Sequence, residues 1–376
     1  MNDHAQIIKN LELKVGKYEE LLAEILQKRK MIGFIQAGPH NKLYRISGEN
    51  NSTHLLPAEP NENIKFKIGD TVIFNENLVL ELLPEELTIK KKITEFKKIN
   101  WDQVGGMKSQ IEKIRDAVEM PLKNANLYKE LGVPPIKGIL LWGPAGCGKT
   151  LIARVIASVI LNETNTDDAE AFVYVKGPEL LSTFVGQAEM RIRQLFESSR
   201  TYKKKTGHRS VIFIDEAEAI LPKRNSRISS DVDTTIVPTF LAEMDGFEEG
   251  HPLVILSTNL PNNIDTAILR DGRIDLKIEV ARPTLEDIPE IFEIHLSKTK
   301  VEGNIKTMSK KATKLLASLS TKNILSGAMI ENLVHKAAHR AIKRKVSDKT
   351  CTSVIQLEDI QHSIAELTKN YETGAN

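Results

Sequence analysis

The sequence is short of cysteine, of long apolar runs and of net charge, and each shortage excludes a class of protein. Only two cysteines occur among 376 residues, Cys147 and Cys351, so neither a disulfide framework nor a cysteine-bound metal cluster is expected. No apolar run approaches the roughly 20 residues of a membrane-spanning helix, and Met1 to Asn10 lacks the apolar segment of a signal peptide. We therefore expect a protein of the reducing cytoplasm.

A net charge of +2 at pH 7 gives the chain no overall electrostatic bias toward nucleic acid or acidic lipid. A hydrophobic content of 41% and a charged content of 27% are ordinary for a globular protein. The length exceeds that of one ordinary domain, and it predicts two or three of them.

The first segment has the apolar period of a coiled coil. Apolar residues alternate three and four positions apart, with Lys and Glu between them, at Ile8, Leu11, Val15, Tyr18, Leu22 and Ile25. This heptad seam predicts a coiled coil over residues 5–30, although its length is near the lower limit for a stable pair of helices. The alternative is one amphipathic helix packed on its own chain.

Residues 31–88 change to the pattern of short strands. Turns of Gly, Pro and Asn separate apolar or alternating runs at 33–36, 43–46, 54–56, 64–66, 71–74 and 78–82. This pattern predicts a small β-barrel, of the OB type. OB barrels bind single-stranded nucleic acid through aromatic and basic side chains, here Phe34, Tyr44, Phe66, Phe74, Lys42, Arg45, Lys65 and Lys67. Alternating charge around core aromatics explains these residues as well, so nucleic acid is the less favoured partner.

After a charged linker over residues 90–98, strand and helix patterns alternate. Apolar strands are expected near 139–142, 172–175, 211–214, 253–258 and 276–280, with helices between them. This order predicts an α/β fold over residues 89–283, in which a parallel sheet is covered on both faces. Thr284-x-x-Asp287 resembles a capping box, and the pattern after it is helical. We expect an all-helical subdomain over residues 284–370 and a tail over residues 371–376.

The strongest motif is a glycine-rich loop between an apolar strand and a helix. It fits G-x-x-x-x-G-K-[ST] and consists of Gly143, Pro144, Ala145, Gly146, Cys147, Gly148, Lys149 and Thr150, followed by Leu151 in the helix. Such a loop curls around phosphates, to which its N–H groups and the helix N-terminus present positive potential. Lys149 is expected to reach the β- and γ-phosphates of ATP, and Thr150 to ligate Mg²⁺.

Two further apolar strands end in residues suited to the same chemistry. The run over 211–214 ends in Asp215 and Glu216, and the run over 254–256 continues to Asn259. Asp215 is expected to hold Mg²⁺ through its water shell, and Glu216 to orient and polarise the attacking water. The amide of Asn259 is suited to hydrogen-bond the γ-phosphate and this water, although a polar strand end is by itself mostly a turn signal.

These strand ends, together with the segment 267–275, are similar to the AAA family of hexameric ATPases from residue 101 to about residue 367. Arg270 and Arg273 flank Gly272, and nothing local explains them as partners of the chain's own phosphate loop. The resemblance implies that both arginines reach into the adjacent subunit's site as arginine fingers, where a cation stabilises charge on the transferred phosphoryl group. The alternative is that both arginines form salt bridges at the protein surface.

The same resemblance implies further contacts to the nucleotide. Val104 and Gly105 match positions on the adenine side, and His295 matches a position near the nucleoside. Gly327 and Ala328 resemble the pair that replaces a second sensor arginine. The segment 244–247 resembles the one that relays the nucleotide state to the neighbouring subunit.

Other segments, at 176–181 and 229–238, are similar to the bacterial proteasome-associated ATPases, the AAA ATPases forming ring-shaped complexes. Phe184, Val185 and Gly186 match their aromatic-hydrophobic-Gly pore loop, which implies contact with a protein substrate; a core aromatic is the alternative for Phe184. That family has two tandem OB barrels. This chain has room for one, as in the archaeal proteasome-activating nucleotidase, and residues 370–376 lack the hydrophobic-Tyr-any ending that docks to a protease.

The interpretation that joins these motifs is a homohexameric, Mg²⁺-ATP-driven unfoldase that threads protein substrates through a central pore and feeds a proteasome-like protease. One alternative is a protease-independent ATPase that dismantles a particular complex. A second alternative, of a different class, is a coiled-coil and OB binding module that uses ATP as a switch.

Overall fold

The computed structural model describes residues 31–40, 43–47, 53–57, 71–74, 79–82, 99–163, 171–181, 187–223, 235–246, 251–317, 325–348, 350 and 352–372. The chain divides into two compact units, Met1–Lys92 and Ile93–Asn376, and each is described by itself. Several predictions lie outside the described residues: the heptad seam, the strand at 64–66, the charged linker, the segment 184–186 and residues 373–376 of the tail.

The first unit contains a five-stranded antiparallel sheet. Its strands are β1 (Met31–His40), β2 (Leu43–Ser47), β3 (Thr53–Pro57), β4 (Thr71–Phe74) and β5 (Val79–Leu82), in the order β3-β2-β1-β4-β5. Every strand predicted within the described residues is present. The sheet has a small core made of Ile35, Tyr44, Ile46, Leu56, Val72, Phe74 and Val79. No ladder joins β3 to β5 among these residues, so the closed OB-like barrel stays a prediction.

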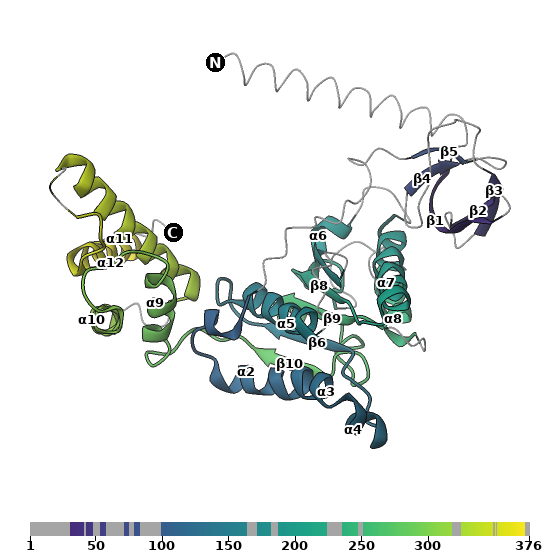
Figure 1. Cartoon of the computed structure of the whole chain (residues 1–376), viewed down its shortest axis with the longest axis horizontal. Coiled ribbons are helices and arrows are strands. Elements are labelled where there is room, and N and C mark those ends of the chain that lie inside the picture. The colour runs from purple at the N-terminus through teal and green to yellow at the C-terminus, as the bar shows by residue number, and fades with distance from the viewer. Residues whose placement is uncertain are drawn as a thin grey trace, which may run out of the picture. The chain divides into compact units, whose positions relative to one another are not determined.

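The second unit begins with short helical segments and continues with alternating strands and helices (Figure 1). The first segments are η2 (Trp101–Gln103), α2 (Lys108–Ile114), the π-helical turn η3 (Arg115–Glu119), α3 (Met120–Lys123) and α4 (Ala125–Glu130). The alternating part contains β6 (Gly138–Trp142), α5 (Lys149–Glu163), β7 (Phe172–Lys176), α6 (Gly177–Leu180), α7 (Gln187–Thr206), β8 (Val211–Asp215), η5 (Ala217–Ala219), α8 (Val237–Asp245), β9 (Leu253–Thr258), η7 (Pro261–Asn263) and β10 (Leu276–Glu279). It is followed by α9 (Ile288–Leu296), α10 (Ile305–Ala317), α11 (Gly327–Ser347) and α12 (Leu357–Glu372).

The strands β6 to β10 form one parallel sheet in the order β10-β6-β9-β8-β7. All five expected strands are present, each within one residue of its predicted bounds. Their continuous apolar sequences are explained by burial on both faces, which parallel sheets require. The predicted α/β fold of this part of the chain is confirmed.

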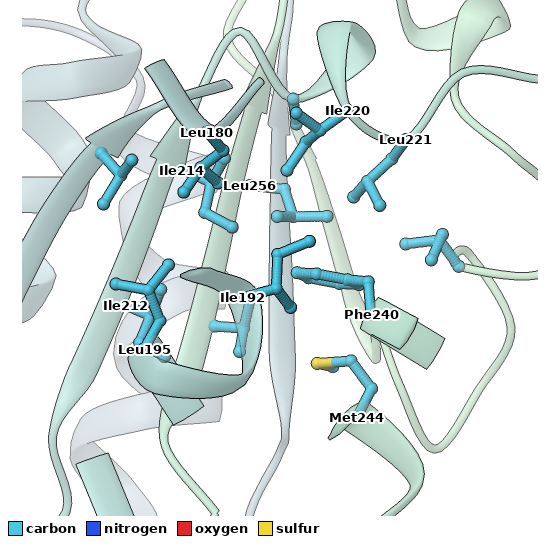
Figure 2. Packing of buried hydrophobic residues seen from close by; sticks show 14 of the residues in the cluster. Leu180, Ile192, Leu195, Ile212, Ile214, Ile220, Leu221, Phe240, Met244 and Leu256 are labelled. Carbon is cyan, nitrogen blue, oxygen red and sulfur yellow. The ribbon is translucent and has the colours of Figure 1, made fainter. Parts of the chain in front are cut away.

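Alternate residues of each strand supply two separate cores, because successive side chains of a strand point to opposite faces. Ile212 and Ile214 of β8 belong to the core beneath α6, α7 and α8, whereas Val211 and Phe213 belong to the core beneath α2 and α5. Figure 2 shows the first of these cores, in which side chains of α7 and α8 pack on β8 and β9. Truncating a fully buried ring such as Phe240 to Ala would cost about 3–5 kcal/mol.

Helices α9 to α12 share a third core, and the described residues of this subdomain contain no strand. Helix α12 continues to Glu372, two residues past the predicted boundary at residue 370, and the sequence has no glycine or proline between Leu357 and Gly374. The capping box is half formed. The N–H and hydroxyl of Thr284 both donate to Asp287 Oδ2, at 2.9 and 2.7 Å. No helix among the described residues is long and apolar enough to cross a membrane.

Candidate nucleotide-binding site

Three adjacent strands bring the predicted residues to one edge of the parallel sheet. Strands β6, β9 and β8 are neighbours, and parallel strands end at the same edge. The glycine-rich loop follows β6, Asn259 follows β9, and Asp215 and Glu216 stand at the end of β8. Ligands of open α/β sheets bind at this carboxyl edge.

The glycine-rich loop leaves β6 through a backbone conformation that favours glycine. Gly143 has a φ of 147°, and a Cβ at this position would overlap the carbonyl oxygen of Val280. The N–H of Gly143 donates to the carbonyl of Thr258 at 3.2 Å, which ties the loop to β9. Helix α5 then begins at Lys149, and its first turn supplies N–H groups that have no partner within the helix.

Lys149 is held at the base of the loop by neutral oxygen atoms. Its residue surface is only 7% exposed, and its Nζ donates to the carbonyls of Gly143 and Pro144, both at 2.8 Å. A third bond runs from Nζ to Asn259 Oδ1 at 2.7 Å. Burial lowers the pKa of Lys149, and the neighbouring Cys147, Asp215 and Glu218 oppose this shift. The cation can therefore turn to a phosphate by exchanging a neutral acceptor.

Asp215 and Thr150 place hard oxygen ligands side by side. The hydroxyl of Thr150 donates to Asp215 Oδ2 at 3.2 Å. The other carboxylate oxygen, Oδ1, accepts the N–H of Glu216 at 3.1 Å, and Glu216 is exposed. Carboxylate and hydroxyl oxygens are ligands that Mg²⁺ prefers, so the residues at this position fit the predicted metal.

The helical subdomain closes one side of the site. The N–H of Ala328 donates to the carbonyl of Gly146 at 3.0 Å, which joins the start of α11 to the phosphate loop. Ser326 caps α11, because its Oγ accepts the N–H of Met329 at 3.3 Å. The N–H of Gly106 donates to Glu290 Oε2 of α9 at 3.0 Å. The phosphate loop and the turn at Gly106 are therefore both hydrogen-bonded to the helical subdomain.

Two titratable side chains of the pocket, His295 and Cys147, are held neutral by burial. Burial lowers the pKa of His295, whose Nδ1 lies 3.8 Å from Glu331 Oε1; the Glu331 charge opposes the shift. Burial raises the pKa of the Cys147 thiol, and the charges of Arg282 and Lys149 oppose this shift. We expect an imidazole and a thiol, both uncharged, at neutral pH.

These elements enclose a pocket of about 700 Å³, a volume suited to a nucleotide. The residues predicted from the sequence that line it are Val104, Gly105, Ala145, Gly146, Cys147, Gly148, Lys149, Thr150, Leu151, Asp215, Glu216, Asn259, His295, Gly327 and Ala328. Gly143 and Pro144 are not in the lining, and they act on it through the carbonyls that bind Lys149.

The pocket also contains residues that the sequence analysis missed. They lie around α2, after β10 and in or beside α9. The chief ones are Met107, Gln110, Arg282, Thr284, Asp287, Ile291 and Lys298. Residues 281–284 follow β10, the neighbour of β6, so the rule that parallel strands end at one edge could have found them. The missed residues in and just before α2, and those in and beside α9, carry no local signal, because only packing brings those helices to the loop.

The two arginines do not line this pocket. Arg273 forms a bidentate pair with Asp245, in which Nε donates to Oδ1 at 2.7 Å and Nη2 donates to Oδ2 at 2.6 Å. Its Nη1 donates to the carbonyl of Ala267 at 2.6 Å. The hydrogen bond from Arg273 holds the pKa of Asp245 below its usual range. Arg270 is exposed, and no partner of its side chain is recorded among the described residues.

A phosphate loop after one parallel strand and a carboxylate at the end of a nearby strand define a P-loop nucleotide-binding protein. The comparisons with known proteins narrow this class. The family model of the ATPase family associated with various cellular activities (AAA) matches residues 139–282.

Curated relatives resemble most of the chain. The "AAA ATPase forming ring-shaped complexes" of Corynebacterium glutamicum is 31% identical over 96% of this chain and 74% of the relative. The protein of that name from Corynebacterium diphtheriae is 36% identical over 75% of this chain and 59% of the relative. The "Proteasome-associated ATPase" of Mycolicibacterium smegmatis is 35% identical over 77% of this chain and 55% of the relative. The chain thus spans little more than half of the last two relatives, and it belongs to the AAA family of ATPases.

Proposed function

We propose that the protein is a Mg²⁺-dependent ATPase that forms a homohexameric ring and uses hydrolysis to unfold and translocate protein substrates. The observation that carries the proposal is the convergence of Lys149, Asp215 and Asn259 at one sheet edge, with Lys149 and Asn259 in direct contact. Ring formation is supported by the names of the relatives, which describe ring-shaped complexes and association with a proteasome.

The chemical roles follow from what each side chain can reach. Lys149 would exchange the amide of Asn259 for a γ-phosphate oxygen, and this exchange frees the amide to orient the attacking water. Glu216 would hold the same water and accept its proton as general base. Thr150 and Asp215 would hold Mg²⁺, which supplies neutralisation of the phosphate charge when bound.

Completion of the site by a second subunit is supported by the positions of the arginines. Arg270 and Arg273 lie outside the pocket of their own chain, as expected of residues that act on a phosphoryl group in another copy. Arg273 must first exchange Asp245 for that group. An arginine supplied to a developing phosphoryl charge is worth about 10³–10⁵ in kcat.

The rest of the proposal concerns the parts that handle substrate. We assign a coiled coil to residues 5–30, an OB-like barrel to 31–88, the sheet subdomain to 89–283 and the helical subdomain to 284–370. The antiparallel sheet of β1 to β5 supports the barrel. Contact of Phe184, Val185 and Gly186 with substrate, and transfer of substrate to a proteasome-like protease, are supported by the sequence resemblance and by the relatives' names.

The test of the chemistry is the Glu216→Gln variant. It should bind ATP like the wild type and lose about 10²–10⁴-fold in turnover, because an amide cannot accept the proton of water. Glu279→Gln, the same change at an exposed position of β10, is the matched control and should leave turnover unaltered. Substrates and partners retained on the ATP-bound Glu216→Gln protein can then be isolated and identified. Wild-type turnover in Glu216→Gln would remove this residue from the mechanism.

A second experiment separates a motor from a nucleotide-controlled binding module. Phe184→Ala should keep basal ATPase activity and thermal stability but lose the unfolding of a tagged, stably folded protein, whereas Phe184→Tyr should keep both functions. Truncating a packed core ring would instead cost about 3–5 kcal/mol of stability. A marked fall in melting temperature together with lost turnover in Phe184→Ala would contradict the pore assignment.

A further inference from the structure

The ends of strands β7 and β8 lie side by side next to the pocket. Lys176, the last residue of β7, pairs with Asp215, the last residue of β8, in the parallel ladder. The residues that follow, Gly177 and Glu216, are therefore neighbours although they are far apart in the sequence. Gly177 is buried and opens α6, whereas Glu216 is exposed and lines the nucleotide pocket.

Glu216 has a backbone conformation that is uncommon for a residue with a side chain. Its φ of 54° and ψ of 46° lie in the left-handed region. The conformation is supported by two hydrogen bonds: Glu216 N–H donates to Asp215 Oδ1 at 3.1 Å, and Glu216 C=O accepts the N–H of Ala219 at 3.0 Å. This turn sets the direction in which the Glu216 carboxylate leaves the strand.

The carbonyl of Glu216 occupies the space that a side chain at position 177 would need. A Cβ built on Gly177 overlaps the Glu216 carbonyl oxygen and lies 3.2 Å from its carbon and 3.3 Å from Ala219 Cβ. The φ of Gly177 is outside the left-handed region, so the contact, and not the backbone angle, requires glycine here.

The Gly177 side of this contact has little freedom to move. Lys176 belongs to a ladder of five residue pairs with β8, and Pro178 occupies the first turn of α6 with its φ fixed by the ring. The Glu216 side follows the same ladder at Asp215, in a strand that also pairs with β9, and its own turn is held by two hydrogen bonds. An added methyl group would therefore push the two turns apart, and a displaced Glu216 backbone would carry its carboxylate with it.

We propose that Gly177 is a positioning residue for the Glu216 carboxylate, because its bare Cα allows the left-handed turn that directs this carboxylate at the nucleotide. The inference rests on the proposed role of Glu216 in hydrolysis. The contact also joins α6 to the catalytic edge, and in the sequence α6 is followed closely by the segment 184–186, which is predicted to meet substrate. A shift of α6 would therefore change the position of Glu216, because Gly177 lies directly against the Glu216 carbonyl.

The test compares Gly177→Ala with Glu179→Ala in the full-length protein. Gly177→Ala should lower the kcat for ATP by about 10²-fold, the cost of a misplacement of roughly 1 Å. Its KM and its affinity for a fluorescent ATP analogue should stay close to those of the wild type, because Lys149 and the loop are untouched. Its melting temperature should fall only modestly, because the backbone must shift to admit one methyl group. Glu179→Ala removes an exposed side chain from the same helix and should leave all four quantities unaltered.

Other outcomes would overturn the inference. A wild-type kcat in Gly177→Ala would show that Glu216 does not depend on this contact. A parallel loss of nucleotide binding and melting temperature would show that Gly177 supports the fold and not the carboxylate. Glu216→Gln, measured in the same series, separates the two hypotheses. If it keeps full turnover, the proposed role of Glu216 in hydrolysis fails, and if it alone is inactive, only the role of Gly177 fails.

Discussion

The phosphate edge and the turn around Arg273 hold their cations in opposite ways. Lys149 is buried and bonded to two carbonyls and an amide, all of them neutral. Arg273 is bonded through two nitrogens to the carboxylate of Asp245, whose side chain is half exposed. Bidentate bonds between full charges are the stronger kind. Lys149 can therefore turn to a phosphate more easily than Arg273, which requires an event that separates it from Asp245.

The largest expected effect concerns the arginines. Arg270→Ala and Arg273→Ala should each bind ATP almost normally and lose about 10³-fold or more in kcat, because a cation is removed from the transition state. Mixing either variant with Lys149→Ala protein should restore activity at mixed interfaces once the subunits exchange. Arg340→Ala, at an exposed position of α11, is the matched control.

Two results would contradict the proposal that these arginines complete the site of a neighbouring subunit. The absence of rescue, when exchange of subunits has been demonstrated, would mean that the arginines do not act on a neighbour. ATPase activity from a proven monomer would mean that the pocket of one chain is complete.

The next largest effect concerns the phosphate edge. Lys149→Ala should weaken the binding of ATP by at least about 10²-fold, since a buried charge-assisted contact to phosphate is lost. Titration calorimetry with ATP measures this, and Lys277→Ala, an exposed lysine of β10, should bind normally. Near-normal affinity in Lys149→Ala would place the phosphates elsewhere.

A smaller effect is expected where the helical subdomain meets the phosphate loop. Ser326→Ala removes the cap of α11 and should cost about 0.5–2 kcal/mol in the free energy of unfolding. It should also weaken nucleotide binding, because the adjacent Ala328 bonds to Gly146. Denaturant unfolding with and without nucleotide separates the two effects. If the free energy of unfolding and the affinity for nucleotide both stay unchanged, the start of α11 does not shape the pocket.

The smallest effect concerns the pair of Asp245 and Arg273 itself. The folded-state pKa of Asp245 lies below the unfolded value of about 3.9. The stabilisation that the pair provides is therefore complete above the unfolded pKa, and it is lost as the pH falls through the folded-state pKa. The difference in melting temperature between the wild type and Asp245→Asn should be small, constant from pH 6 to 8, and should shrink below about pH 4. A difference that grows on acidification would contradict the pairing.

Local sequence predicted the parts of the fold that depend on contiguous residues. The strands of the parallel sheet are confirmed. Runs such as Val211–Ile214 could be predicted because every residue in them is apolar, which indicates a buried strand. Helix α12 runs to Glu372, two residues past the boundary predicted at 370, and helix ends are hard to predict because they depend on weak stop signals. Arg282 and Lys298 were missed in the pocket because their approach to the loop depends on how distant elements pack.

The sequence by itself determined the phosphate loop and the polar strand ends, because the required residues are adjacent in the chain and the parallel strands carry them to one edge. Only the tertiary structure decided the bond from Ala328 to Gly146, the pair of Arg273 with Asp245 and the contact of Gly177 with Glu216. Each joins residues from separate segments of the chain. Such contacts are set by the packing of whole elements, and no local pattern of residues records them.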